Sequence, residues 1–197
     1  MRVPESLIDD LCNRLQDDGI FLDFGANVGL ITKLILDRTP QNIRVISIEP
    51  DPIAFQSLRK NIKSKRVSLI NAAAWSSSNQ LPLFRRVSLS GEIATTSSSL
   101  NSSKVNIQVN EFEMVQTIDI CELLNGVNNP RIIVKMDVEG AEYELINHMI
   151  NRGCIRKIDK LYCEFHFNSI RFGYSKHIYL FIKLFLTRNT QKIESWF

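Results

Sequence analysis

The stretch KMDVEGAEYE (residues 135–144) places a lysine and several carboxylates directly after a run of apolar residues. Lys135, Asp137 and Glu139 stand at alternate positions, so their side chains share one face where a strand ends. A carboxylate in that position can take the proton from a hydroxyl group as it reacts. The lysine can form an ion pair with Asp137 or Glu139, or it can position a substrate directly.

Two further groups, Glu164 and His166, follow the apolar run KLYC, and alternation places them on the same face as Tyr162. Imidazole titrates near neutral pH without any perturbation. Asp137 needs burial to raise its pKa, and the neighbouring Lys135 opposes that shift. The sequence therefore leaves two hypotheses for a general base, Asp137 and His166.

The same carboxylate and imidazole groups are of the types that can hold a divalent ion. Nothing in the spacing of Asp137, Glu139 and the Glu164–His166 pair specifies a metal geometry, so no metal is predicted. Glu142 and Glu144 lie where the next helix begins, a position in which carboxylates suit the helix dipole. We interpret both as structural.

A glycine-containing loop, FLDFGANVGL (residues 21–30), lies between an expected strand and an expected helix. Amides at the start of such a helix favour a polar or anionic ligand group. A dinucleotide-binding loop would have glycine in place of Asn27, and Asp23 adds a negative charge before the turn between Gly25 and Gly29. These features favour a ligand with an ammonium group that faces Asp23.

Glu49 ends the second expected strand, about 20 residues beyond the loop, where a carboxylate can accept hydrogen bonds from ribose hydroxyls. A ribose and an amino acid without pyrophosphate point to S-adenosylmethionine. Each residue also has a structural interpretation: Asp23 can cap the turn, Asn27 can adopt left-handed φ, and Glu49 can be solvated.

The elements that must position these residues alternate along the chain. Apolar runs predict strands at 19–24, 43–49, 66–73, 131–138 and 160–167, and helical spacing predicts helices at 7–15, 27–38, 52–64 and 141–150. Asp51 can cap the third helix, with Pro52 at its first position. From Tyr174 a helix and then a last strand, QKIESWF, are expected. The alternation predicts an α/β three-layer sandwich with a mostly parallel twisted sheet.

Residues 76–119 interrupt this alternation as a strand and loop insertion. The segments 81–89 and 105–118 are expected to form strands or hairpin arms, and the Ser/Thr-rich stretch between them is expected to be a loop, flexible over 89–103. The loop is either a slack linker or a flap over a substrate. We predict one domain over 1–197.

Composition excludes several classes of protein. The net charge of +3 over 197 residues does not indicate a nucleic-acid binder, and the cluster Lys60, Lys63, Lys65 and Arg66 is either a solvated helix end or a phosphate-binding patch. The N-terminus does not resemble a signal peptide, and no 18-residue apolar run occurs, so no membrane contact is predicted. The scattered cysteines predict no paired framework, a buried free thiol at Cys163, and a cytoplasmic protein.

The segments FLDFGANVGL, ISIEPDPIAFQSLRKNI, NAAAWS, QTIDICELL and IIVKMDVEGAEYELI resemble, in this order, the consecutive motifs of FkbM-type methyltransferases. YCEFH resembles the next strand of that family, so that the resemblance covers roughly 18–168. The pattern K-x-D-x-E-G-x-E is fairly specific to the family, whereas the glycine loop is shared with most class I methyltransferases.

The resemblance implies a Rossmann-like class I methyltransferase fold, S-adenosylmethionine as cofactor, and a hydroxyl acceptor on a small molecule or sugar. By position, the resemblance implies that the methionine part of the cofactor would be surrounded by Asp23, Gly25, Asn27 and Gly29. Glu49 would hold the ribose, and the adenine would be contacted by Asn71, Ala72 and Ala73. Asp137 would lie near the methyl group. The family has a final hairpin that this chain either lacks or shortens, which gives six strands or a minimal seventh.

The resulting prediction is an S-adenosylmethionine-dependent O-methyltransferase, as a monomer or homodimer. A cofactor-binding module without catalysis, or a partner subunit, is the alternative. Nucleic-acid methylation is the weaker alternative for an enzyme, because no N-P-P-Y-type motif follows the fourth strand.

Overall fold

The parallel sheet expected from the apolar runs forms the centre of the molecule. The computed structural model describes residues 4–15, 18–87, 93–102, 104 and 110–196. Six strands pair in the order β10-β9-β8-β1-β2-β3, and every pair is parallel. Their bounds are β1 Ile20–Phe24, β2 Arg44–Ile48, β3 Val67–Ile70, β8 Ile132–Met136, β9 Lys160–Cys163 and β10 Ile193–Ser195.

The final antiparallel hairpin of the family does not occur in the described part of the chain. β10 instead pairs with β9 in parallel, with Glu194 opposite Tyr162. The six-stranded alternative that the sequence left open is therefore the one observed.

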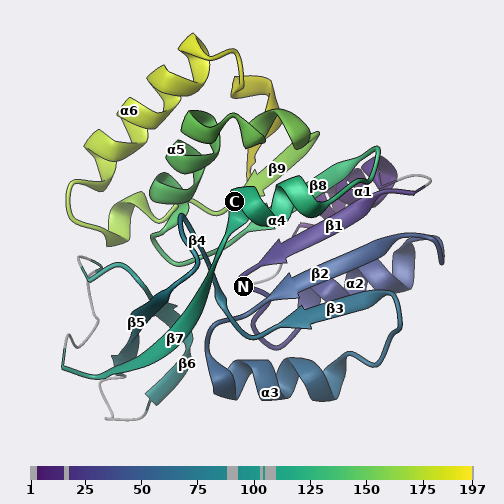
Figure 1. Cartoon of the computed structure of the whole chain (residues 1–197), viewed down its shortest axis with the longest axis horizontal. Helices are drawn as coiled ribbons and strands as arrows, with labels where there is room; N and C mark the ends of the chain where they lie inside the picture. The colour runs from purple at the N-terminus through teal and green to yellow at the C-terminus, as the bar shows by residue number, and fades with distance from the viewer. Residues whose placement is uncertain (1–3, 16–17, 88–92, 103, 105–109, 197) are drawn as a thin grey trace.

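Helices cover both faces of this sheet (Figure 1). One layer is α1 Glu5–Arg14, α2 Leu30–Arg38 and α3 Pro52–Asn61; the other is α4 Ile120–Gly126, α5 Glu142–Arg152 and α6 Gly173–Leu186. Short 3-10 helices are η1 Cys154–Lys157, η2 Phe167–Ser169 and η3 Thr190–Lys192. The predicted cap of α3 is confirmed, because the Asp51 carboxylate accepts hydrogen bonds from the amides of Ile53 and Ala54.

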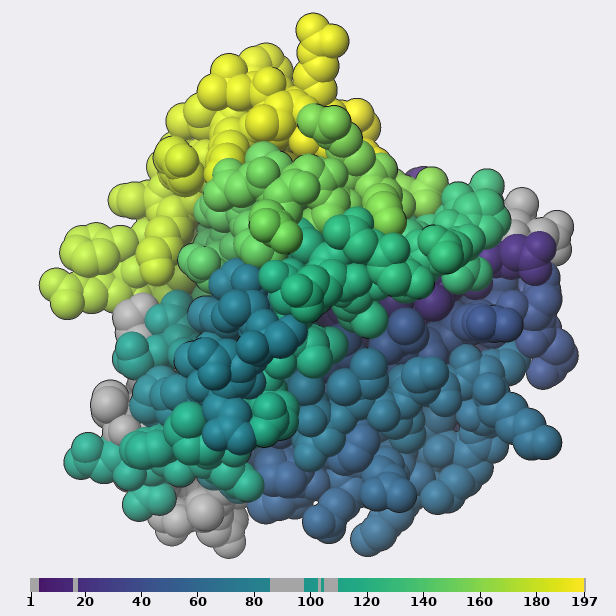
Figure 2. Space-filling view, viewed as in Figure 1, coloured from purple at the N-terminus to yellow at the C-terminus, as the bar shows by residue number. Residues whose placement is uncertain are grey.

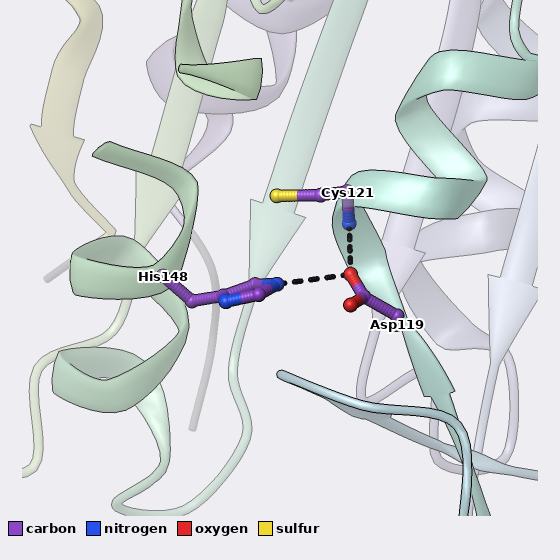
Figure 3. Close-up of side chains that lie close together, drawn as sticks. All are labelled: Asp119, Cys121 and His148. Atoms are coloured by element: carbon purple, nitrogen blue, oxygen red, sulfur yellow. Dashed lines mark hydrogen bonds and ion pairs between the residues drawn. The ribbon is translucent and has the colours of Figure 1, made fainter. Parts of the chain in front are cut away.

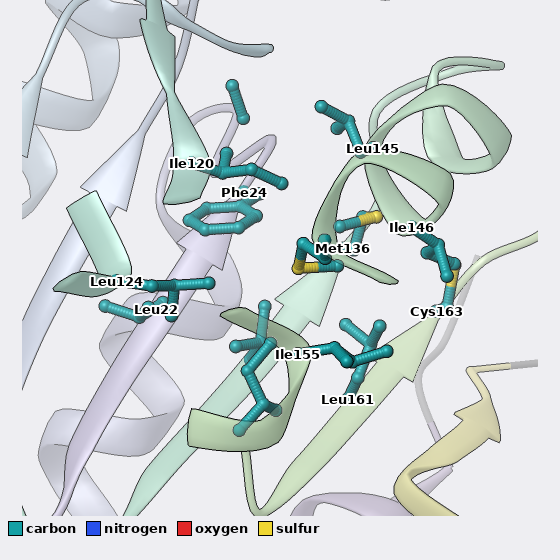
Figure 4. Close-up of a cluster of buried hydrophobic side chains, with 14 of the residues drawn as sticks. Leu22, Phe24, Ile120, Leu124, Met136, Leu145, Ile146, Ile155, Leu161 and Cys163 are labelled. Carbon is teal, nitrogen blue, oxygen red and sulfur yellow. The ribbon is translucent and has the colours of Figure 1, made fainter. Parts of the chain in front are cut away.

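The two layers bury opposite faces of the strands, as the period of two requires. Leu22 and Phe24 of β1 pack with Met136 of β8 and with residues of α4 and α5 (Figure 4). Phe21 and Ile133 face α1 and α2 on the other side. Asp23 and Lys135 lie on this second face as well, among apolar neighbours, and so require a specific explanation.

The segment between β3 and α4 forms a second sheet with the order β4-β7-β5-β6. Its strands are β4 Ala73–Trp75, β5 Gln80–Val87, β6 Ile93–Ser99 and β7 Phe112–Asp119. The expectations of one strand through residue 73 and of a loop over the whole of 90–103 were wrong. The chain leaves the first sheet after Ile70, and β6 gains its backbone hydrogen bonds by antiparallel pairing with β5, which composition does not reveal. Part of the stretch expected to be flexible, 89–92 and 103, lies outside the described residues.

Two of the cysteines are bonded to each other, contrary to the prediction of no pairing. Cys121 at the start of α4 and Cys154 at the start of η1 form a disulfide across a sequence separation of 33 residues. Cys163 is a buried free thiol, as predicted. The disulfide removes part of the basis for expecting a reducing compartment, so a cytoplasmic location stays a prediction.

Candidate active site

A cavity opens where the carboxyl ends of β1, β2 and β8 meet the second sheet. Its volume is about 70 Å³, and it is open to the solvent. It is lined by Gly25, Asn27, Glu49, Pro50, Ala73, Ala74, Leu83, Ser98, Leu100, Asp137, Val138, Glu139 and Ala141. The cavity thus collects residues from five strand ends and from the turn before α5.

The glycine loop can take its path only because Gly25 has no side chain. Gly25 has a φ of +78°, and a Cβ atom placed on it would lie 1.8 Å from the carbonyl oxygen of Asp137. The amide of Asp137 in turn donates to the carbonyl of Phe24. The loop after β1 and the end of β8 are therefore in direct backbone contact. Gly29 lies away from the cavity and packs against Leu58.

Glu49 is held in position by two backbone amides. One carboxylate oxygen accepts from the amide of Asn27 at 2.8 Å and the other from the amide of Asp51 at 2.9 Å. Burial raises the pKa of Glu49 to about 7, although both of these hydrogen bonds favour the ionised form. The side-chain oxygen of Asn27 is buried and has no hydrogen-bond partner in the described part of the chain.

The three residues after β3 divide into different roles. The side-chain amide of Asn71 donates to the carbonyls of Glu49 and Pro50 and so ties β3 to the end of β2. Ala72 is buried, and Ala73 lines the cavity, whereas Asn71 and Ala72 do not. The small side chains of the two alanines leave room beside the carboxylate of Glu49.

Lys135 and Asp23 form a buried ion pair beneath the glycine loop. The lysine nitrogen lies 3.2 Å from Asp23 and 3.7 Å from Asp137, and it donates to the carbonyl of Gly25 at 2.7 Å. Burial alone would lower the pKa of Lys135, but the charges of Asp23 and Asp137 raise it above its ordinary value. The hydroxyl of Thr32 donates to the other oxygen of Asp23. The sequence left open an ion pair of Lys135 with Asp137 or with Glu139. Among the described residues Lys135 pairs with Asp137 and not with Glu139.

Asp23 does not reach the cavity wall, because its side chain lies on the α2 face of the sheet and is 0% exposed. The sequence predicted that an ammonium group of a ligand faces Asp23. It did not reveal that the carboxylate of Asp23 is already paired with Lys135.

His166 lies at the centre of a group of carboxylates beyond the ends of β8 and β9. Its Nδ1 is 2.8 Å from Glu142, and its Nε2 is 3.2 Å from Glu139, 3.7 Å from Glu164 and 3.9 Å from Asp137. β9 ends at Cys163, three residues before the predicted strand reaches His166, because pairing with β8 stops at Met136.

The carboxylates keep His166 protonated at neutral pH. Burial lowers the pKa of His166, but the hydrogen bond with Glu142 and the charges of Glu142, Glu139 and Asp137 outweigh burial and raise it to about 9. Burial and the charge of Asp137 raise the pKa of Glu164. An imidazolium cannot accept a proton, so the expectation that His166 titrates near neutrality was wrong.

Glu142 was interpreted as a helix-dipole residue, but it is completely buried and reaches back into the site. One oxygen accepts from the amide of Gly140 and faces His166, while the other has no hydrogen-bond partner among the described residues. Glu144 is exposed, in agreement with a structural role. A partner 24 positions away in the sequence gives no local signal, which explains the omission of Glu142.

The second sheet closes one side of the site through the end of β6. The hydroxyl of Ser99 donates to the carbonyl of Glu139 at 2.6 Å, and the side-chain amide of Asn101 donates to the carbonyl of Gly140. Lys104 is bonded to the carboxylate of Glu139. Glu139 has a φ of +56°, which is uncommon for a residue with a side chain, and these contacts hold it there.

These contacts favour the flap interpretation of the Ser/Thr-rich stretch over the linker interpretation. Ser98 and Leu100 line the cavity, and sequence reasoning had not selected them or Leu83. Serine and leucine in a polar segment carry no pattern that distinguishes a cavity wall from an ordinary strand.

A second group of polar side chains, Asp119, Cys121 and His148, lies between α4 and α5 (Figure 3). Asp119 caps α4 by accepting from the amide of Cys121, and its carboxylate is 2.9 Å from the ring of His148. Because the sulfur of Cys121 is bonded to Cys154, the thiolate that a metal would need is not free. This group connects two helices and is separate from the cavity.

The family model of the methyltransferase FkbM domain matches residues 23–192, which include every residue that lines the cavity. The chain belongs to the FkbM methyltransferase family. The predicted resemblance is therefore confirmed, and the α/β fold with its mostly parallel sheet agrees with it.

A relative of this chain, the hexuronic acid methyltransferase AglP of Haloferax volcanii, is 26% identical over 168 residues. The aligned region covers 84% of this chain and 64% of that protein, so the chain spans less than two thirds of its relative. A solved structure, the precorrin-6y C5,15-methyltransferase of Geobacter metallireducens, is similar with a TM-score of 0.48 and 13% identity, over 92% of this chain and 71% of that one.

Proposed function

We propose that this FkbM protein is an S-adenosylmethionine-dependent O-methyltransferase that acts on a hydroxyl group of a sugar or another small molecule. The observation that carries the proposal is the position of Glu49. Two backbone amides fix its carboxylate on the wall of the cavity. Asp137 lines the same cavity from the end of β8, and β1 lies between β8 and β2 in the sheet.

The residues that line the cavity fit the cofactor. Glu49 offers a fixed carboxylate to a ribose, and the unpaired oxygen of Asn27 offers an acceptor to an ammonium group. Gly25 lines the cavity and lets the loop pack directly on the backbone of Asp137, and Ala73 and Ala74 leave space for a flat base beside Leu83. When bound, S-adenosylmethionine supplies a methyl group on a positively charged sulfur.

Asp137 is the residue that we assign as general base. Its side chain is 30% exposed at the cavity, and it is acceptor-only when ionised. His166 carries a proton at neutral pH and therefore serves to hold the carboxylates of Asp137, Glu139 and Glu164 in place. Lys135 lies 3.7 Å and His166 lies 3.9 Å from the Asp137 carboxylate, and these two groups hold it at the cavity.

The acceptor class rests on family evidence. The relative AglP is a hexuronic acid methyltransferase, which supports a sugar hydroxyl as acceptor. A single-domain organisation, a cytoplasmic location and a monomeric or homodimeric state remain predictions.

Calorimetry with S-adenosylhomocysteine tests the cofactor half of the proposal. We expect binding by the unaltered chain and a loss of affinity of about tenfold or more in Glu49→Ala, because charged hydrogen-bond partners contribute about 1.5–3 kcal/mol. Glu122→Ala, an exposed glutamate of α4 outside the cavity, is the matched control and should bind normally.

Methyl transfer to uronic acid glycosides and to neutral glycosides tests the catalytic half. Binding without turnover on any hydroxyl acceptor would favour the alternative of a non-catalytic module. Failure of the folded chain to bind S-adenosylhomocysteine would overturn the proposal as a whole.

A further inference from the structure

The outward face of α6 is apolar, although it is exposed. Its large apolar side chains are between 37% and 74% exposed, with Phe185 and Leu186 the most exposed within the helix. The exposed set is Tyr174, Ile178, Tyr179, Phe181, Ile182, Phe185 and Leu186, preceded by Phe172. Leu180 and Leu184 supply the buried stripe on the opposite side. We call the exposed set, with Phe172, the α6 face.

A helix of a globular protein normally turns polar residues to the solvent, whereas one that is apolar all round is covered by something. α6 is the outermost helix of its layer and lies beyond α5 from the central sheet (Figure 1). The C-terminal part of the chain forms a projecting edge of the molecule (Figure 2). A contiguous exposed set of this kind marks an interaction surface.

The segment that carries the α6 face contributes charges of one sign only, while the exposed Glu144 of α5 lines a groove together with Lys176 and Tyr179. No aspartate or glutamate occurs anywhere from Phe165 to Ile193, and the cations in that stretch are Arg171, Lys176, Lys183, Arg188 and Lys192. Arg171, Lys176 and Arg188 are exposed, and Lys183 is hydrogen-bonded to Asn147 and Asn151 of α5. The surface that covers this face must therefore accept apolar side chains and offer negative charge.

Phe172 adds a second indication. It is 68% exposed and has a φ of +57°, a backbone conformation that bulky side chains rarely adopt. The guanidinium of Arg171 lies 4.9 Å from the centre of its ring. An aromatic ring and a cation are thus held together at the N-terminal end of the α6 face.

We propose that the α6 face is a docking surface for a bilayer that contains anionic lipids. An apolar stripe with flanking lysine and arginine residues matches the acyl boundary and the negative headgroups of such a bilayer. The helix lies on the bilayer and does not cross it: α6 has 14 residues, and no described helix is long and apolar enough to span a membrane. This inference replaces the expectation of no membrane contact.

A second copy of the chain fits the α6 face less well. In a two-fold dimer the same patch occurs on both sides of the interface. Arg171, Lys176 and Arg188 would then face the same cations of the other copy, with no carboxylate of this stretch between them. On a bilayer that contains anionic lipids, these three cations would instead face negatively charged headgroups.

Sedimentation of the whole chain with lipid vesicles tests the proposal. We expect binding to phosphatidylcholine vesicles that contain phosphatidylglycerol to exceed binding to pure phosphatidylcholine by about tenfold or more, and to weaken as salt is added. The variant Phe185→Ser with Leu186→Ser removes apolar side chains, and Arg171→Gln with Lys176→Gln and Arg188→Gln removes charge. Each should reduce binding about tenfold or more.

Matched controls come from other exposed positions. Met114→Ser on β7 removes an apolar side chain that is 52% exposed. Lys60→Gln with Lys63→Gln and Lys65→Gln removes exposed cations near α3. Both controls should bind vesicles normally, and circular dichroism should show that every variant is folded.

Three results would overturn the proposal. Equal binding to vesicles with and without phosphatidylglycerol would remove the charge argument. A loss of binding in the Lys60 control set but not in the α6 variants would move the surface to α3. A dimer in analytical ultracentrifugation that Phe185→Ser with Leu186→Ser dissociates, without any vesicle binding, would assign the face to a second copy.

Discussion

The ammonium nitrogen of Lys135 lies 3.2 Å from a carboxylate oxygen of Asp23, and both side chains are buried. Removing one member of such a pair leaves the other charge buried without its partner, which costs about 3–5 kcal/mol. We expect Lys135→Met to lower the free energy of unfolding by that amount, measured by urea denaturation. The exposed salt-bridge variant Arg14→Met should lower it by about 1 kcal/mol or less.

The double variant Lys135→Met with Asp23→Asn should be more stable than the sum of the two single changes predicts. Additive effects would show that the two groups are not coupled, and would contradict the account of the buried pair.

The close approach of Gly25 to Asp137 predicts a substitution that affects structure and binding together. Gly25→Ala creates a collision with backbone, so we expect a loss of stability greater than about 2 kcal/mol and loss of S-adenosylhomocysteine binding. Gly153→Ala is the matched control, because Gly153 has a similar φ of +74° but no atom within 4 Å of the added Cβ. It should cost only the backbone strain, about 1–2 kcal/mol, and leave binding intact.

The pKa of about 7 at Glu49 predicts that cofactor affinity depends on pH. In the proposed complex, ribose hydroxyls would donate to the ionised carboxylate, so binding would favour the deprotonated form. Affinity for S-adenosylhomocysteine should therefore fall as pH decreases below about 7, with proton release on binding in that range. Glu49→Gln should bind more weakly and without this pH dependence, and calorimetry in buffers of different ionisation enthalpy measures both effects.

The rate of methyl transfer should distinguish Asp137 from His166 as the base. With Asp137 as base and the cofactor at a saturating concentration, kcat/KM for the acceptor stays level from neutral pH and falls as His166 loses its proton near pH 9. With His166 as base, kcat/KM would rise through pH 9 instead. Asp137→Asn should reduce kcat about 10²–10⁴-fold, while Glu144→Gln in the exposed first turn of α5 should not.

The disulfide predicts sensitivity of the fold to reductant. Closing a loop of this length stabilises a protein by about 3–4 kcal/mol in the chain-entropy model, so reduction should lower the free energy of unfolding by a similar amount. Alkylation of the denatured, unreduced chain should modify Cys12 and Cys163 only. Equal stability with and without reductant would contradict the prediction.

The sequence predicted the elements whose signals are local. β1, β2 and β8 are mainly apolar runs, and Asp51 followed by Pro52 marks the start of α3. The sequence also predicted that residues at strand ends, such as Glu49 and Asp137, lie at one edge of the sheet, because the carboxyl ends of parallel strands meet there.

What the sequence did not predict depends on partners far away in the chain. Glu139 is bonded to Lys104, 35 residues earlier, and Glu142 faces His166 across the end of β9. The raised pKa of His166 arises from this arrangement, so it could not be inferred from the type of residue. β6 was missed for the same reason, since its pairing with β5 and not its composition makes it a strand.

The hydrogen bonds from Ser99 and Asn101 to the turn at Glu139 and Gly140 connect the two sheets at the cavity. The wall formed by the glycine loop is fixed to the end of β8, whereas the wall formed by β6 is attached mainly through these side chains. Under the proposed function, we therefore expect ligand and product to exchange more easily on the β6 side. We expect substitutions at Ser99 to change dissociation rates, while substitutions at the glycine loop change equilibrium affinity.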